Sequence, residues 1–306
     1  MAEGGKVAIL GVFVADTAYR AARLPRIGET IMGKSFALGP GGKGSNQAVA
    51  AARLGAETVF ISRLGRDAFA DLALATWAEA GVVPAVARSE TATGAAFIYV
   101  DAATGDNAII VSPGAAAEIS AADIDAAAEA IRGADVFMTQ LEQPLEAARR
   151  GLEIARAAGA ATVLNPAPAA ELDDGLIALC DWLTPNESEA AALTGLTVET
   201  PDEARAAAAA LRARGARGAV VTLGAAGALL SWPGGEALVP AVDAGPVAET
   251  TGAGDAFNGG FATALARGAD PVEAARYGCA VAGISVTRPG TADSMPTEED
   301  VAALLR

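Results

Sequence analysis

The chain has 306 residues, of which 52% are hydrophobic, and 37 acidic residues against 22 basic ones give a net charge of −15. This length suits one large α/β domain or two small ones. The chain contains no histidine, which excludes nucleophiles activated by histidine, histidine-ligated zinc sites and phosphohistidine relays. The acidic balance, without a cluster of Lys and Arg, argues against nucleic acid and anionic membranes as partners.

The two cysteines, Cys180 and Cys279, cannot build a disulfide framework, which favours a reducing compartment. The first apolar run, Val7 to Val14, is too short to cross a membrane, and no basic leader precedes it. We therefore expect a cytoplasmic protein.

Short apolar runs alternate with Ala-rich helical patterns along the chain. The predicted strands are Val7–Phe13, Val59–Ser62, Val136–Thr139, Thr162–Leu164 and Ala219–Leu223. The predicted helices are Ser45–Leu54, Ala68–Ala80, Leu145–Ala158, Asp202–Arg214, Asp255–Ala266 and Pro271–Val286. This alternation predicts an α/β fold of three αβα layers around a mostly parallel central sheet.

Two stretches, residues 17–38 and 95–111, interrupt the alternation. The first contains extended pieces at Glu29–Met32 and Ser35–Leu38, and the second is typical of a hairpin around the turn DAATGDN. We expect a small β-sheet lid inserted in a single domain that spans residues 1–306. The alternative is a surface hairpin without a function.

One glycine-rich pattern, Gly28 to Ser35, satisfies the GxxxxGK[ST] phosphate loop. That loop needs a buried strand before it and a helix directly after it, so that the helix N-terminus meets the phosphates. Here Leu24-Pro25-Arg26 precedes the pattern and an extended run follows it. We interpret the match as chance.

A second pattern, Gly39 to Gly44, satisfies GxGxxG and opens a helix. A dinucleotide-binding fingerprint follows the first strand of the sheet, and an acidic residue follows the next strand. The next predicted strand ends in Ser62-Arg63 instead. An NAD(P)-dependent oxidoreductase is therefore a remote alternative.

The run from Thr250 to Gly259, TTGAGDAFNG, is the strongest candidate for chemistry. Small residues gather backbone amides where a helix starts, and free N–H groups with the helix dipole form an anion hole. Asp255 beside this hole can accept a proton from a hydroxyl while the amides hold a phosphoryl group. The simpler interpretation makes Asp255 an N-terminal helix residue that the dipole favours.

Two further runs suit phosphate or nucleotide contacts. Thr184-Pro-Asn-Glu-Ser-Glu189 ends a strand and starts a helix, and Asn186 with Glu189 equally predicts an ordinary capping box. The run Val220–Gly227 is a strand that ends in a glycine turn before a second strand, which by itself predicts an ordinary hairpin.

Together these motifs resemble the ribokinase branch of the PfkB-type carbohydrate kinases. The resemblance runs from Val7 to about Pro296 and rests on GGKGSNQAVA from Gly41, QLE from Gln140, NPAP from Asn165, TPNESE from Thr184 and GAGDAFNG from Gly252. It implies an ATP-dependent kinase that phosphorylates O5 of a pentose such as D-ribose. It also implies Mg²⁺, K⁺ and a homodimer joined through the lid.

The resemblance assigns a role to each matching residue. Asp255 would be the base, and Gly252, Ala253 and Gly254 would supply the anion hole. The sugar pocket would be lined by Val14, Asp16, Gly42, Lys43, Asn46, Glu142 and Asp255. Magnesium and the nucleotide would be held by Asn186, Glu189, Thr222, Gly224, Gly227, Gly254 and Cys279. The monovalent cation would lie near Glu249, Thr251, Ser285, Arg288, Gly290 and Ser294.

Two positions depart from the family pattern. Val14 stands where an Asn is usual, and its side chain cannot hydrogen-bond a sugar hydroxyl, so it suits a sugar that lacks one, such as 2-deoxyribose. Glu249 stands where an Asp is usual beside the cation loop, which makes potassium activation a hypothesis. A deoxyribokinase or another small-sugar kinase is the near alternative, and a non-catalytic sugar sensor is disfavoured by Asp255 and its anion hole.

Overall fold

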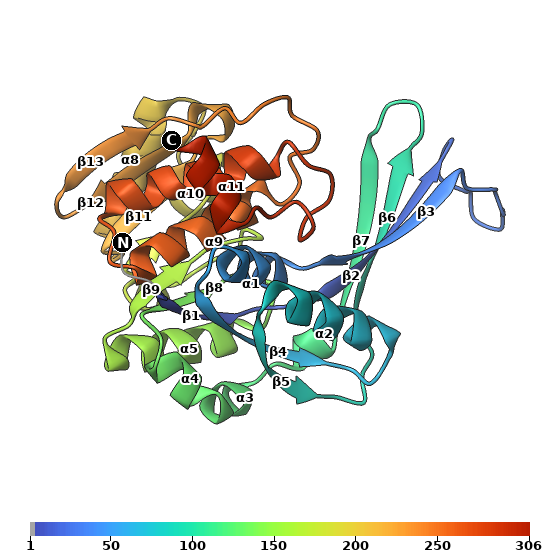
Figure 1. The fold of residues 1–306 in the computed structure, drawn as a ribbon, viewed down its shortest axis with the longest axis horizontal. Coiled ribbons are helices and arrows are strands. Elements are labelled where there is room, and N and C mark those ends of the chain that lie inside the picture. The colour runs from blue at the N-terminus through green and yellow to red at the C-terminus, as the bar shows by residue number, and fades with distance from the viewer. Residues whose placement is uncertain (1–3) are drawn as a thin grey trace.

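The computed structural model describes residues 4–306, whose strands form two sheets (Figure 1). The strands are β1 Lys6–Leu10, β2 Val14–Ala21, β3 Ser35–Gly41, β4 Glu57–Leu64, β5 Val83–Arg88, β6 Thr93–Asp101, β7 Asn107–Gly114, β8 Val136–Thr139, β9 Ala161–Leu164, β10 Trp182–Leu183, β11 Gly218–Thr222, β12 Ala228–Trp232 and β13 Gly235–Val239. The larger sheet has the order β13-β12-β11-β10-β9-β8-β1-β4-β5. Within it β12 alone runs opposite to the other strands.

Helices cover both faces of this sheet (Figure 1). They are α1 Lys43–Arg53, α2 Ala68–Ala80, α3 Ala121–Ala126, α4 Ala128–Arg132, α5 Leu145–Ala158, α6 Asp174–Ile177, α7 Glu187–Thr194, α8 Pro201–Ala213, α9 Ala253–Ala266, α10 Pro271–Ser285 and α11 Glu298–Leu304, with short 3₁₀ turns at Ala115–Glu118 and Gly224–Ala226. The predicted three-layer α/β fold is confirmed.

Strand β1 shows how the sequence produces two cores. Successive side chains of a strand point to opposite faces of the sheet. Val7 and Ile9 pack with residues of α1, α2, α9 and α10, whereas Ala8 and Leu10 pack with residues of α4, α5 and α8. A strand buried on both faces is a continuous apolar run rather than an alternating one. For this reason the parallel strands could be predicted from short hydrophobic stretches.

The second sheet has the order β3-β2-β6-β7 and projects from the body of the molecule (Figure 1). Strand β2 pairs antiparallel with β3 and parallel with β6, and the predicted hairpin is confirmed as β6 and β7. Asp16 lies opposite Gly39 and Ala96, so these three residues share one face. The neighbouring Thr17 lies opposite Leu38 and therefore belongs to the other face.

Two predicted strands need correction. The strand at Val7–Phe13 ends at Leu10, because the chain leaves the sheet at Gly11, where a Cβ would lie 2.5 Å from the Gln140 side chain. The apolar residues that follow Leu10 are buried in the connection to β2, so the hydrophobic run in the sequence continues past the end of the strand. The strand at Glu29–Met32 is wrong: this segment is a loop between β2 and β3, and Met32 is 90% exposed.

Neither glycine-rich pattern has the structural context that its motif requires. Gly28 to Ser35 lies in the loop before β3, and a strand rather than a helix follows it. Gly39 to Gly44 joins β3 of the second sheet to α1, and does not follow β1 of the main sheet. Among residues 4–306, no helix combines the length and the apolar character that crossing a bilayer requires.

Candidate active site

The candidate residues gather at the carboxyl edge of the main sheet. Gln140 follows β8, Asn165 follows β9, Thr184 follows β10 and Thr222 ends β11. Asp255 faces them from the first turn of α9. Open α/β sheets bind ligands outside the carboxyl ends of their strands, and the parallel order of β1, β8, β9, β10 and β11 brings these residues together.

The N-terminus of α9 presents free backbone amides. Gly252 caps the helix with a φ of 82°, a left-handed conformation that favours glycine. The N–H of Ala253, which we expected to join the anion hole, donates to the Thr250 carbonyl at 3.2 Å. Within the described residues 4–306, the N–H groups of Gly252, Gly254 and Asp255 have no acceptor in reach. Three unpaired amides at a helix N-terminus suit an anion.

Asp255 is buried and is held by two side chains of α1. Asn46 Nδ2 donates to its Oδ2 at 3.0 Å, and Gln47 Nε2 donates to its Oδ1 at 3.0 Å. Burial raises the pKa of Asp255, whereas the Lys43 charge and the two amide donors lower it. The carboxylate therefore has a fixed orientation and an environment that partly restores its charge.

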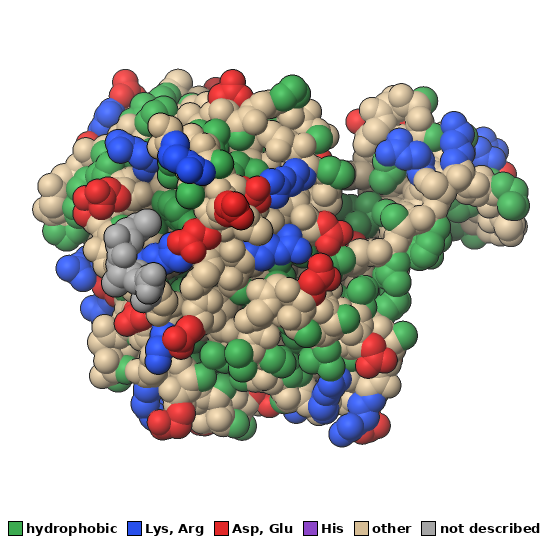
Figure 2. Space-filling view, in the orientation of Figure 1, with side chains coloured by type: hydrophobic (Ala, Val, Ile, Leu, Met, Phe, Trp, Pro, Cys, Tyr) green, Lys and Arg blue, Asp and Glu red, His purple; other side chains and the backbone are tan. Residues whose placement is uncertain are grey.

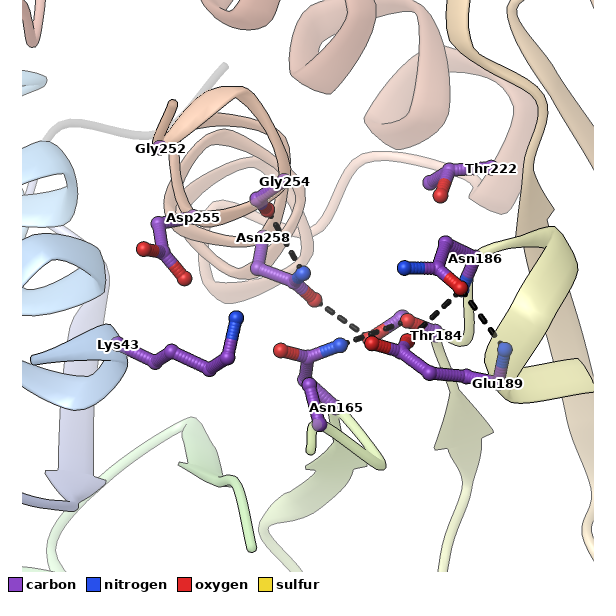
Figure 3. A pocket seen from close by; sticks show the side chains of 11 residues that line it. Lys43, Asn165, Thr184, Asn186, Glu189, Thr222, Gly252, Gly254, Asp255 and Asn258 are labelled. Atoms are coloured by element: carbon purple, nitrogen blue, oxygen red, sulfur yellow. Dashed lines mark hydrogen bonds between the residues drawn. The ribbon is translucent and has the colours of Figure 1, made fainter. Parts of the chain in front are cut away.

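A cavity of about 150 Å³ lies in front of Asp255. Figure 3 shows the Lys43 side chain extending from α1 into it, with Asp255 and Asn165 on either side. The residues that line it are Lys43, Asn165, Ala167, Thr184, Asn186, Glu189, Thr222, Gly252, Gly254, Asp255 and Asn258. Asn46 does not line this cavity, but its side chain contacts Asp255, and its buried Oδ1 has no hydrogen-bond partner in the described part of the chain, which leaves it free to accept from a ligand hydroxyl.

Two further carboxyls lie on the α1 side of the site. Glu142 Oε2 accepts a hydrogen bond from the Lys43 backbone N–H at 2.8 Å. Burial raises the pKa of Glu142 to about 7 and that of Asp16 to about 6. Asp16 packs against Gly41, where a Cβ would lie 2.3 Å from its carboxylate, so this close approach requires glycine. Carboxylates that are short of hydrogen-bond donors suit a polyhydroxylated ligand.

Asn186 and Glu189 form the predicted capping box of α7. The Asn186 side chain accepts from the Glu189 N–H at 2.8 Å, and Glu189 Oε2 accepts from the Asn186 N–H at 2.9 Å. Both residues also line the cavity (Figure 3), and burial raises the pKa of Glu189. The structural and functional interpretations of this motif are thus compatible, because the cap fixes a carboxylate at the cavity wall.

A second cavity, of about 750 Å³, adjoins the first and is mainly apolar in its lining. Asn186, Thr222 and Gly254 line both cavities, so the two meet at the N-terminus of α9. The other lining residues are Glu187, Gly224, Ala225, Gly227, Ala241, Val242, Asp243, Ala244, Gly245, Val247, Thr250, Ala253, Phe257, Cys279, Ala282, Gly283 and Val286. This arrangement fits a ligand with an apolar ring system and a polar tail.

The residues expected around a monovalent cation lie on neighbouring loops and at the end of α10, and they differ in their contacts. Glu249 Oε2 accepts from the Gly290 N–H at 2.9 Å, which joins the two loops that carry them. Arg288 pairs instead with Asp300 of α11 at 3.1 Å. The hydroxyls of Ser285 and Ser294 donate to the carbonyls of Ala282 and Thr291, and Thr251 is exposed beside Gly252.

The remaining predicted residues flank the site. Val14 is 5% exposed at the start of β2, opposite Gly41, and Gly42 precedes α1 with a φ of 89°. No cluster of three His, Cys, Asp or Glu side chains that could hold a metal occurs among the residues the structure describes. A cation here would therefore depend on backbone oxygens, single carboxylates and ligand phosphates.

The sequence reasoning missed the amide network behind the site. The Asn165 side chain donates to the Thr184 carbonyl at 2.9 Å, Thr184 Oγ1 donates to Asn258 Oδ1 at 2.6 Å, and Asn258 Nδ2 donates to the Gly254 carbonyl at 2.8 Å. These residues stand inside the motifs quoted above, so the signal was present. Which of the motif residues contact one another could not be inferred from one sequence.

Comparisons with known proteins agree with this geometry. The family described as pfkB family carbohydrate kinase matches residues 5–298. The ribokinase of Haemophilus influenzae is 38% identical over 97% of both chains, and the deoxyribokinase of Salmonella typhi is 37% identical over 96% of both. The structure of Arabidopsis thaliana ribokinase complexed with ribose and ATP superposes with a TM-score of 0.93 at 30% identity, covering 99% of both chains.

Proposed function

The chain belongs to the PfkB family of carbohydrate kinases, and on that basis we propose that it is an ATP-dependent ribokinase that transfers the γ-phosphoryl group of ATP to O5 of D-ribose. One observation carries the proposal: a buried carboxylate, Asp255, stands in the first turn of α9, next to the unpaired amides of Gly252 and Gly254. The carboxylate and the amides face the junction of a small polar cavity and a larger apolar one.

Asp255 is the proposed base. It accepts the O5 proton as the oxygen bonds to the γ-phosphorus and the bond from that phosphorus to the bridging oxygen breaks, which releases ADP. An aspartate of ordinary pKa is a weak base for an alcohol, but phosphoryl transfer through a loose transition state needs little early proton removal. Positioning and charge stabilisation therefore dominate. The amides of Gly252 and Gly254 and the Lys43 ammonium are placed to hold the transferring group.

The sugar is assigned to the α1 side of Asp255, beside the polar cavity, and the nucleotide to the apolar cavity. Lys43, Asn46, Asp16 and Glu142 supply donors and acceptors for the sugar hydroxyls, and the buried unpaired Asn46 Oδ1 supports this assignment. Cys279 and the turn from Gly224 to Gly227 line the apolar cavity, and we assign them to the nucleotide base and ribose.

Two cations fit the site. Glu189 offers a carboxylate on the wall of the small cavity, next to Asn186, which lines both cavities. Mg²⁺ takes one or two carboxylates together with phosphate oxygens. When bound, Mg²⁺ would neutralise phosphate charge. The loops joined by Glu249 and Gly290, with the backbone oxygens around Thr251, Ser285, Arg288 and Ser294, are the proposed place for K⁺.

We assign the second sheet as a lid within one kinase domain. Asp16 lies on its sugar-side face, and closure would exclude water and suppress ATP hydrolysis. The opposite face carries Tyr19, Phe36 and Phe97, whose rings are packed 5.1 and 5.5 Å apart although each is more than a third exposed. Figure 2 shows hydrophobic side chains along this projecting sheet. An exposed apolar face of this kind supports a homodimer joined through the lids.

A deoxyribokinase is the second candidate, and Val14 favours it. This buried apolar side chain stands at the start of β2, two residues before Asp16, and cannot pair with a hydroxyl. A deoxyribokinase is also among the similar proteins.

ADP release from MgATP, with D-ribose and 2-deoxy-D-ribose compared in potassium buffer, separates the candidates. Preference for ribose supports the proposal, and preference for 2-deoxyribose replaces it with the second candidate. Without sugar-dependent ADP release from either pentose, the ribokinase proposal fails.

A further inference from the structure

Gln47 is a fully buried side chain of α1 that the site assignment leaves without a role. Its Nε2 donates to Asp255 Oδ1 at 3.0 Å and also points to Asn165 Oδ1 at 3.3 Å. Gln47 is not among the residues that line either cavity, so any effect on a substrate passes through Asp255 or Asn165.

The orientation of the Gln47 amide is set by Gln140. Gln140 Nε2 donates to Gln47 Oε1 at 2.5 Å, so the oxygen of Gln47 is occupied and its NH₂ group faces Asp255. Gln140 is itself confined, because a Cβ at Gly11 or Gly44 would lie 2.5 or 2.8 Å from its Oε1. That oxygen has no hydrogen-bond partner among residues 4–306. The side-chain amide of Gln140 therefore makes its hydrogen bond through its NH₂ group, to Gln47.

We propose that Gln47 is a positioning residue whose side-chain amide, turned by Gln140, holds the Asp255 carboxylate ionised and aimed at the sugar hydroxyl. The inference rests on the proposed kinase activity and extends it to a residue behind the base. The Gln47 amide does not itself titrate, so it can donate its hydrogen bond to the carboxylate at every pH.

The charges around Asp255 explain why this donor matters. Burial favours the neutral acid, and the carboxyls of Glu142 and Glu189 lie close enough for the Asp255 charge to raise their own pKa values. Lys43, Asn46 and Gln47 oppose the effect of burial on Asp255. A protonated Asp255 cannot accept the O5 proton. Loss of one of the two amide donors therefore shifts the group toward its inactive form.

The test compares Gln47→Met with wild type. Methionine keeps the length of the side chain and removes both polar atoms. Hydrogen bonds to charged groups are strong enough that losing one should move the acid limb of the kcat profile up by about one to two pH units. At a pH on the acid limb this lowers kcat by roughly 10–100-fold, and kcat recovers toward the wild-type value as the pH rises above the limb. KM for ATP stays unchanged.

Ser45→Ala is the matched control. Ser45 lies on the same helix, is fully buried, and its Oγ accepts from Trp77 Nε1 at 2.9 Å, so its loss removes a buried hydrogen bond without touching Asp255. It should lower the Tm and leave the acid limb in place. Should Gln47→Met fold poorly, Gln140→Met, which frees the Gln47 amide to turn, gives a smaller shift in the same direction.

A second readout does not require turnover. In protein labelled with ¹³C at aspartate carboxyls, the Asp255 resonance, identified by its absence in Asp255→Asn, should titrate at higher pH in Gln47→Met than in wild type. An unmoved titration together with an unmoved acid limb overturns the inference. An inactive wild type with the titration shift present would refute the kinase proposal while leaving the positioning contact intact.

Discussion

Glu142→Gln should stabilise the protein at alkaline pH. Burial raises the pKa of the Glu142 carboxyl to about 7 from an ordinary 4.5. Below the lower value the group is protonated in both the folded and the unfolded chain. As the pH rises, the unfolded chain releases its proton first, so the folded state loses stability until the pH passes about 7. The full difference between the two pKa values corresponds to about 3 kcal/mol in the free energy of unfolding, at about 1.36 kcal/mol per pH unit.

Glutamine removes this titration and keeps an oxygen for the Lys43 backbone N–H, which donates to Glu142 at 2.8 Å. Between pH 5.5 and 8.5 the expected gain is about 2 kcal/mol. An unfolding entropy of about 2.1 cal/mol/K per residue, over 306 residues, converts this to about 3 °C. The difference in Tm between variant and wild type should therefore grow by about 3 °C across this range.

Thermal melts at the two pH values measure this difference. Glu146→Gln is the control, because it makes the same chemical change at an exposed position of α5 and should leave the difference constant. A Glu142→Gln difference that is the same at both pH values would refute the reasoning. It would mean that the folded chain does not disfavour the ionised carboxylate.

Three further predictions concern catalysis. Asp255→Asn should lower kcat by roughly 10²–10⁴-fold, the usual contribution of a positioned base, and near-wild-type turnover would remove Asp255 from that role. Val14→Asn should raise kcat/KM for ribose relative to 2-deoxyribose by roughly 5–150-fold, because pairing a buried hydroxyl is worth about 1–3 kcal/mol. An unchanged ratio would show that Val14 does not contact the position that distinguishes the two sugars. The rate should be higher in potassium than in sodium buffer at equal ionic strength, and equal rates would reject the cation proposal at Glu249.

The sequence predicted those elements whose signals are local. Helices α2 and α5 occupy the expected residues, because Asp67 caps the first and Gly159 ends the second. The loop at Glu29–Met32 was mistaken for a strand, since β-branched and apolar residues also occur in exposed loops. Strand β5 could not be recognised as a short buried apolar run. It lies at the edge of the main sheet with β4 as its one neighbour, and its Val83 remains exposed.

The site was predictable as a set of motifs but not as a geometry. The resemblance placed Asn46 and Asp255 together, and the structure adds the bond between them. It could not predict that Gln47 reaches the same carboxylate, because consecutive helix residues do not ordinarily face one partner. Asp255 lies between both side chains because α9 packs closely on α1, where a Cβ at Gly259 would lie 2.5 Å from Ala50.

Identification of the phosphorylated product tests the central claim most directly. D-ribose and MgATP are incubated with the enzyme, and the position of the new phosphate is read from phosphorus–proton couplings in the NMR spectrum. The account predicts one ribose 5-phosphate for each ADP formed, with almost none from Asp255→Asn under the same conditions. Phosphate on another hydroxyl, or ADP formed together with free phosphate at the same rate with and without sugar, would contradict it.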